Sequence, residues 1–123
     1  MRVHALVGRQ SEIVGPDAPI DEVAALMIER HVGAVAVVDR SGIVGICTDR
    51  DLTQAVSDGL DSETPVSECM TPGPDVISPD VPVVDAAAWM LETGYRHLPV
   101  VEDGELLGIV DSRDVLWALI PKT

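Results

Sequence analysis

The spacing of apolar residues changes several times along the chain, and each change predicts a new element. The apolar pair Ile13–Val14, followed by the turn "GPDAP", predicts a short strand. Apolar residues then recur every three or four positions from Asp21 to Arg30, which indicates a helix. The runs "AVAVV" and "IVGIC", separated by "DRSG", predict a hairpin with a four-residue loop. A second helix starting near Asp49 completes a β-α-β-β-α unit.

The same pattern returns 63 positions later without a gap, as "DVISPDVPVVDAAAWMLETGYRHLPVVEDGELLGIVDSRDV". Its short strand is Val76–Ile77, its first helix runs from Val84 to Thr93, and its second starts near Ser112. The chain therefore divides into repeats at residues 1–62 and 63–123. A unit of about 60 residues is marginally stable alone. We therefore expect the two repeats to share one compact α/β (α+β) architecture.

Composition narrows the class of protein. The 123 residues are 46% hydrophobic and 24% charged, with no apolar run long enough to span a membrane and no pattern of a signal peptide. These features predict a cytoplasmic protein without a membrane partner. The net charge of −13 disfavours nucleic acid. Cys47 and Cys69 form no C-x-x-C pair, so we expect reduced thiols.

The sequence does not favour an enzyme. The three histidines lie far apart, and neither an H-E-x-x-H nor a G-x-S-x-G motif is present. Asp49 and Asp51 form a D-x-D that could hold Mg²⁺, but acidic residues opening a helix more often complement its dipole. We therefore predict no catalytic residues, no metal site and no required cofactor.

The phrase "GICTDRDL" and its copy "GIVDSRDV" are the candidate chemistry of the chain. Gly45, Thr48 and Asp51 span the passage from a strand to a helix start, where free N–H groups and the helix dipole attract anions. Thr-x-x-Asp at this place is also close to a capping box, which stabilises a helix whether or not a ligand binds. The residues alone are compatible with either a ligand site or a helix cap.

The order of these motifs resembles a known family. The "M-T" entry, the "S-P-D" turn, "R-H-L-P-V-V", the D-G hairpin and "G-I-V-D-S-R-D" are similar to those of the cystathionine β-synthase (CBS) domain pair, or Bateman module. The resemblance implies two tandem repeats packed sheet to sheet with pseudo-two-fold symmetry. It also implies an adenosine-containing ligand (AMP, ADP, ATP or S-adenosylmethionine) in the cleft between repeats. Such modules commonly regulate an attached enzyme or channel, and they often form homodimers.

The resemblance assigns roles to residues of the first motif. It implies that Gly45 lets the backbone approach the ligand, that Thr48 offers its hydroxyl to ribose or phosphate, and that Asp51 accepts the ribose hydroxyls. Arg96 and His97, just before the second repeat's middle strand, would reach the phosphates of the same ligand. The short first strands would frame the base or form plain core, through Ile13, Val14, Val76 and Ile77.

The second motif departs from the family pattern. Asp111 replaces the expected hydroxyl, although Ser112 stands beside it and Asp114 keeps the ribose position. An added carboxylate repels phosphate, so a neutral or cationic adenosine ligand suits this motif better. No enzyme domain lies within the 123 residues, and we therefore expect a stand-alone regulatory or sensor protein acting on an unknown partner.

A ligand-free dimeric interaction module is the alternative. Asp111 and the divergent stretch "VGAVAV" are compatible with a scaffold that has lost its ligand. Trp89 and Trp117 could then belong to a dimer face, or simply to the core.

Overall fold

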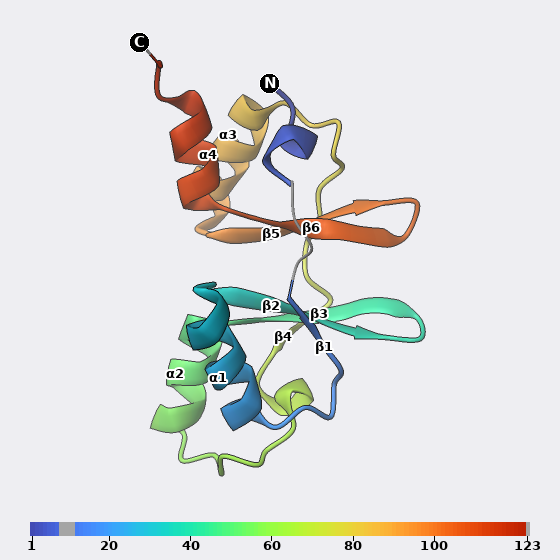
Figure 1. Cartoon of the computed structure of the whole chain (residues 1–123), viewed down its shortest axis with the longest axis vertical. Helices are drawn as coiled ribbons and strands as arrows, with labels where there is room; N and C mark the ends of the chain where they lie inside the picture. Colours follow the sequence, from blue (N-terminus) through green and yellow to red (C-terminus); the bar gives the residue numbers. More distant parts are fainter. Residues whose placement is uncertain (8–11, 123) are drawn as a thin grey trace. The chain divides into compact units, whose positions relative to one another are not determined.

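The computed structural model of the protein describes residues 1–7 and 12–122. The chain forms two compact units, one comprising residues 11–74 and the other residues 1–10 with residues 75–123 (Figure 1). The described residues form four α-helices and two sheets, so the predicted mixed architecture is confirmed.

The unit of residues 11–74 is built on a four-stranded sheet of order β1-β2-β3-β4. β1 pairs with β2 in parallel, while the β2–β3 and β3–β4 pairs are antiparallel. Helices α1 and α2 lie on the same side of this sheet (Figure 1). The elements are β1 (Ile13–Val14), α1 (Ile20–Arg30), β2 (Ala34–Asp39), β3 (Gly42–Thr48), α2 (Asp49–Ser57), the 3-10 helix η2 (Val66–Glu68) and β4 (Thr71–Pro72).

The core of this unit consists of aliphatic side chains and sulfur, because the chain has no phenylalanine. Side chains from both helices and from the two central strands meet there, and η2 covers one end. The buried members are Ile20, Val23, Met27, Val35, Val37, Cys47, Ala55 and Val66.

The unit of residues 1–10 and 75–123 has the same order of helices and central strands but fewer strands in its sheet. Among its described residues, the sheet consists of the antiparallel pair β5–β6. The predicted first strand at Val76–Ile77 is reduced to a single parallel bridge between Ile77 and Val100, the counterpart of the Val14–Val37 pairing 63 residues earlier. The elements are η1 (Val3–Leu6), α3 (Val83–Thr93), β5 (His97–Glu102), β6 (Glu105–Asp111) and α4 (Ser112–Leu119).

The N-terminal segment packs with the second repeat. Val3 N–H donates to the carbonyl oxygen of Val81 at 2.8 Å, and His4 N–H to that of Pro79 at 2.9 Å. The Val3 side chain is completely buried in the same core as α3 and α4. The sequence copies are residues 1–62 and 63–123. The compact units differ from them, because the boundary falls after Pro74 and residues 1–10 belong to the unit of the second repeat.

The predicted four-residue hairpin loops are wrong. Asp39 pairs with Gly42, and Glu102 pairs with Glu105, so each loop has only two residues. Positive φ angles of 51° at Asp103 and 79° at Gly104 suit a tight hairpin turn. Both hairpins also shift register at equivalent places, between Val37 and Val38 and between Val100 and Val101.

Gly45 leaves room for the side chain of Met70. It lies in β3 opposite Pro72, and the side chain of Met70 fills the space above it. A Cβ added at Gly45 would lie 2.9 Å from Met70 Cγ and closer still to its sulfur. Packing against Met70 within the unit therefore favours a residue without a side chain at this position.

We expect Gly45→Ala to lower the free energy of unfolding by about 1–3 kcal/mol, because Met70 must be displaced from a packed position. Gly15→Ala is the matched control, since a Cβ there meets nothing within 4 Å. Urea unfolding measures both. Combining Gly45→Ala with Met70→Ala should show a coupling in a double-mutant cycle. Equal losses for the two glycine variants would contradict the packing argument.

Candidate functional site

A capping box forms where β3 passes into α2. Thr48 has the extended backbone of an N-cap residue, and its hydroxyl oxygen accepts a hydrogen bond from Asp51 N–H at 3.2 Å. Asp51 Oδ2 in turn accepts from Thr48 N–H at 3.0 Å. The capping interpretation of this motif is therefore confirmed, and both side chains are held in place by the protein's own backbone.

Most of the amides at this helix start already have acceptors. Asp49 N–H donates to the carbonyl oxygen of Gly33 at 2.9 Å, and Asp51 N–H donates to the Thr48 hydroxyl oxygen. The prediction that free N–H groups attract phosphate here is wrong for these two positions. An anion at α2 would therefore rely more on side chains than on the helix terminus.

Three oxygen-bearing side chains meet beside the capping box. Thr71, on β4, places its hydroxyl 3.4 Å from each carboxylate oxygen of Asp51. Thr48 and Asp51 are half-buried, while Thr71 is exposed. The Thr48 hydroxyl still has its own proton to donate, and a carboxylate can accept several hydrogen bonds. This set, Thr48, Asp51 and Thr71, can bind a polyhydroxyl group such as a ribose diol.

Thr71 was missed as a candidate residue by the sequence analysis. Its side chain reaches Asp51 only because β4 pairs with β3, through Ile46 and Thr71. β4 has just two residues, Thr71 and Pro72, and a Pro-containing pair gives almost no strand signal. In the sequence, Thr71 stood out only within the "M-T" entry of the family pattern, with no role assigned to it.

The second motif forms the same capping box with different chemistry. Asp111 takes the place of Thr48, and its Oδ1 accepts from Asp114 N–H at 2.8 Å. Asp114 Oδ2 accepts from Asp111 N–H at 3.2 Å. Ser112, the first residue of α4, donates its N–H to the carbonyl oxygen of Arg96 at 2.9 Å. Aspartate thus replaces threonine without loss of the cap.

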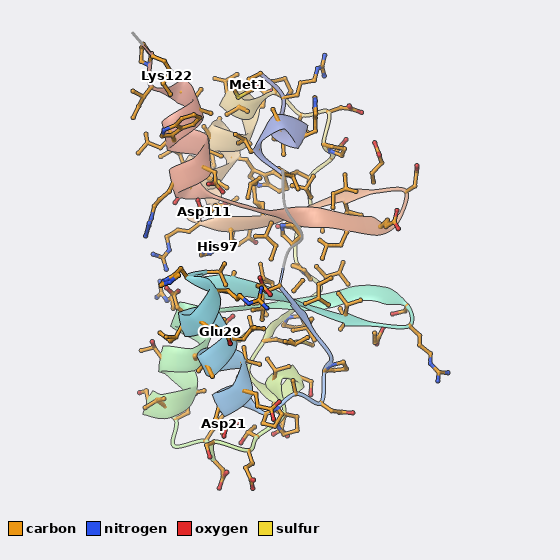
Figure 2. All side chains as sticks on the ribbon, in the orientation of Figure 1. Met1, Asp21, Glu29, His97, Asp111 and Lys122 are labelled. Carbon is orange, nitrogen blue, oxygen red and sulfur yellow. The ribbon has the colours of Figure 1, made fainter. Side chains whose placement is uncertain are left out.

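His97 belongs to this acidic cluster in its own unit. It is the strand partner of Asp111 in the β5–β6 hairpin; both residues are labelled in Figure 2. Burial raises the pKa of Asp114, and the charge of Asp111 acts in the same direction, whereas the Asp111 N–H and the charge of His97 lower it. Arg96, next to His97, is exposed. A basic pair therefore adjoins a carboxylate pair at the start of α4.

The short first strands are only partly core. Ile77 is buried and belongs to the core of its unit, and Val14 packs against the core of the other. Ile13 and Val76 are exposed. The core interpretation thus holds for Ile77, while Ile13 and Val76 offer apolar surface; contact of any of the four with a base stays a prediction.

Within residues 1–7 and 12–122, no group of three or more His, Cys, Asp or Glu side chains is arranged to hold a metal ion. In the same part of the chain, every helix is too short or too polar to cross a membrane.

We expect Thr48→Ala to lower the free energy of unfolding by about 1 kcal/mol, because Asp51 N–H loses its acceptor. Thr48→Asp should retain most of the stability, since Asp111 caps the equivalent helix. Chemical denaturation of the two variants beside the unmodified chain measures the difference. The cap would be unimportant if Thr48→Ala unfolded at the same urea concentration as the unmodified protein.

Comparison with known proteins gives a consistent result. The model of the CBS domain family matches residues 3–58 and 66–121. A 17.7 kDa protein of Acidianus ambivalens is 39% identical over 110 residues, which are 88% of this chain and 66% of that protein. This chain therefore spans slightly less than two thirds of that relative.

Two solved structures share the fold. The CBS domain protein PAE2072 from Pyrobaculum aerophilum, complexed with AMP, is 29% identical with a TM-score of 0.87, covering 97% of this chain and 98% of that one. The CBS domain pair of protein MJ0100, in complex with 5-methylthioadenosine and S-adenosyl-L-methionine, is 25% identical with a TM-score of 0.88, covering 96% and 94%. The repeated unit, the two capping motifs and these matches establish that the chain belongs to the CBS domain family and carries two CBS domains.

Proposed function

We propose that this CBS pair is a regulatory protein that binds an adenosine-containing ligand and has no catalytic activity of its own. The observation that carries the proposal is the set of Thr48, Asp51 and Thr71 at the start of α2, where hydroxyl and carboxylate oxygens meet at a partly exposed position. The complex of the Pyrobaculum protein with AMP supports a nucleotide as the ligand class. Such nucleotides are abundant in the cytoplasm, where we propose that the protein acts.

The capping box decides how a ribose would bind. Asp51 Oδ2 is held by Thr48 N–H, so Oδ1 is the oxygen better placed to accept from a ribose hydroxyl. Thr71 at 3.4 Å is a weak partner that a ribose hydroxyl could displace. Thr48 would donate its hydroxyl proton to a ribose or phosphate oxygen while it still accepts from Asp51 N–H. The ligand would then form further hydrogen bonds to Thr48 and Asp51 without breaking those of the capping box.

The charge of each motif bears on the ligand it prefers. Thr48 is neutral, whereas Asp111 adds a second carboxylate beside Asp114 and disfavours phosphate. For the second motif we propose a neutral or cationic adenosine compound, such as adenosine or S-adenosylmethionine, held by Ser112 and Asp114. The complex of MJ0100 with S-adenosyl-L-methionine supports this class. Phosphate contacts from Arg96 and His97 stay a prediction of the sequence.

Calorimetric titration and thermal unfolding with AMP, ADP, ATP and S-adenosylmethionine test the proposal. A ligand at about 100 times its dissociation constant stabilises the fold by about 2.7 kcal/mol, which is several degrees for a domain of this size. Asp51→Asn should abolish the shift with AMP, because an amide retains one acceptor for the Thr48 N–H but replaces the other with a donor.

Asp114→Asn is the matched control for that experiment, since Asp114 has the equivalent cap position in the other repeat. It should leave the AMP shift in place. An AMP shift that survives Asp51→Asn would overturn the assignment to the first motif. No shift with any of the four compounds would favour the alternative, a ligand-free dimeric interaction module.

We also propose a homodimer, because equivalent helix positions are apolar and exposed in both repeats. Ile28 on α1 is 78% exposed and its counterpart Leu91 on α3 is 87% exposed. Val56 on α2 is 77% exposed, and Leu119 on α4 is 45% exposed. Trp117 is also exposed, with the Lys122 ammonium 4.1 Å from its ring centroid. Isolated exposed apolar residues are ordinary, but the repetition of the same positions indicates a contact surface for a second copy.

Analytical ultracentrifugation tests the dimer. Ile28→Glu combined with Leu91→Glu should weaken association at least tenfold, because two charges would be placed in an apolar interface. Glu29→Gln combined with Glu92→Gln changes the neighbouring exposed positions and should leave the dimer intact. A monomeric unmodified chain at high micromolar concentration would rule the dimer out.

A further inference from the structure

The two cysteines of the chain pack in the same core, although 22 positions separate Cys47 from Cys69 in the sequence. Cys47 is in β3, next to Thr48, and Cys69 stands between η2 and β4. Because β4 pairs with β3 through Ile46 and Thr71, the chain that leads into β4 runs beside the end of β3. The two side chains pack in the same hydrophobic cluster, and the Cys47 sulfur also lies 3.9 Å from the carbonyl oxygen of Thr48.

Solvent reaches the two thiols unequally. Cys47 is completely buried among the aliphatic side chains of its core, whereas Cys69 packs at the edge of that core and is only half-buried. An oxidant dissolved in water can therefore reach Cys69, while Cys47 is accessible to its neighbouring sulfur. This arrangement suits a pair in which one thiol reacts first and the other completes the reaction.

We propose that Cys47 and Cys69 are a modification site at which hydrogen peroxide closes an intramolecular disulfide. The thiolate of Cys69 attacks peroxide, the O–O bond breaks, and the sulfur is oxidised to a sulfenic acid with release of hydroxide. The thiolate of Cys47 then attacks that sulfur; the S–S bond forms, the S–O bond breaks, and the departing hydroxide takes up a proton as water. Overall, two thiols and one peroxide give one disulfide and two waters.

The surroundings keep the pair reduced until the oxidant accumulates. Burial raises the pKa of the Cys47 thiol, and the charges of Cys69 and of Asp51 on α2 add to the effect. Burial also raises the pKa of Cys69, with contributions from Asp51 and from Glu68 on η2, while the hydrogen bond from Cys47 lowers it. Since the thiolate is the reacting form, the reaction is slow near neutral pH and accelerates as the pH rises.

The disulfide would act on the candidate ligand site. It would join the residue before Thr48 to the segment that leads into Thr71, and both threonines contact Asp51. Closing this loop restricts the unfolded chain, so the oxidised protein should also be harder to unfold. Oxidation would thus be a second signal, besides the proposed ligand, that acts near Asp51. The oxidation itself can be tested without any nucleotide.

Peroxide treatment of the folded full chain, followed by mass spectrometry, tests the proposal. We expect the loss of two hydrogen atoms within a single chain, the disappearance of both free thiols, and full reversal by dithiothreitol. The rate should rise about tenfold for each pH unit below the thiol pKa. In a parallel alkylation of the unmodified folded chain, iodoacetamide should label Cys69 well before Cys47.

Matched variants separate the two steps. Cys47→Ala should stop at an oxidised Cys69 that couples only between chains, and Cys69→Ala should leave the buried Cys47 unreacted in the folded protein. Two thiols that persist in the folded chain, under peroxide that oxidises the urea-unfolded chain, would overturn the proposal. Labelling of Cys47 before Cys69 would overturn the assigned order, a result that needs no variant to fold.

Discussion

The reciprocal hydrogen bonds between Thr48 and Asp51 fix the point at which β3 becomes α2, and much of the first repeat is arranged around that point. They set where the helix starts relative to the sheet, and Asp49 N–H bonded to Gly33 ties the same junction to the beginning of β2. Because Asp51 is held there, the Thr71 hydroxyl can meet it across the β3–β4 pair. The candidate ligand set is therefore a product of helix capping.

The second repeat shows that the cap and the ligand chemistry can change independently. Aspartate at position 111 performs the structural task of Thr48, with a hydrogen bond of 2.8 Å to the third helical amide. It also adds a negative charge beside Asp114, whose raised pKa reflects burial and that added charge. A single residue can thus preserve the helix start and alter the charge that a ligand meets. This separation would allow the two repeats to differ in the ligands that we propose for them.

Local periodicity predicted the helices, the hairpins and the order of elements in both repeats, because each depends on residues close together in sequence. The loop lengths were wrong because Asp39 and Gly42 look like turn residues but pair with each other as the last rung of the hairpin. The docking of the N-terminal segment escaped prediction because Val3 finds its partner at Val81. The contact of Thr71 with Asp51 depends likewise on a strand pairing between distant residues. The sequence named Thr48 and Asp51 together, but only the pairing of β3 with β4 supplied Thr71.

A ligand at the first motif would meet a site that is already formed. Thr48 and Asp51 are oriented by hydrogen bonds to the protein's own backbone, so their rotamers need not be ordered on binding. Met70, seated over Gly45, packs the segment that leads to Thr71 against β3. Binding a ligand would therefore cost little side-chain entropy. A movement of β4, however, would displace Thr71 from Asp51 and so alter the site. Cys47 lies in β3 and Cys69 lies shortly before β4, so a bond between them would act on the same strand pairing that brings Thr71 to Asp51.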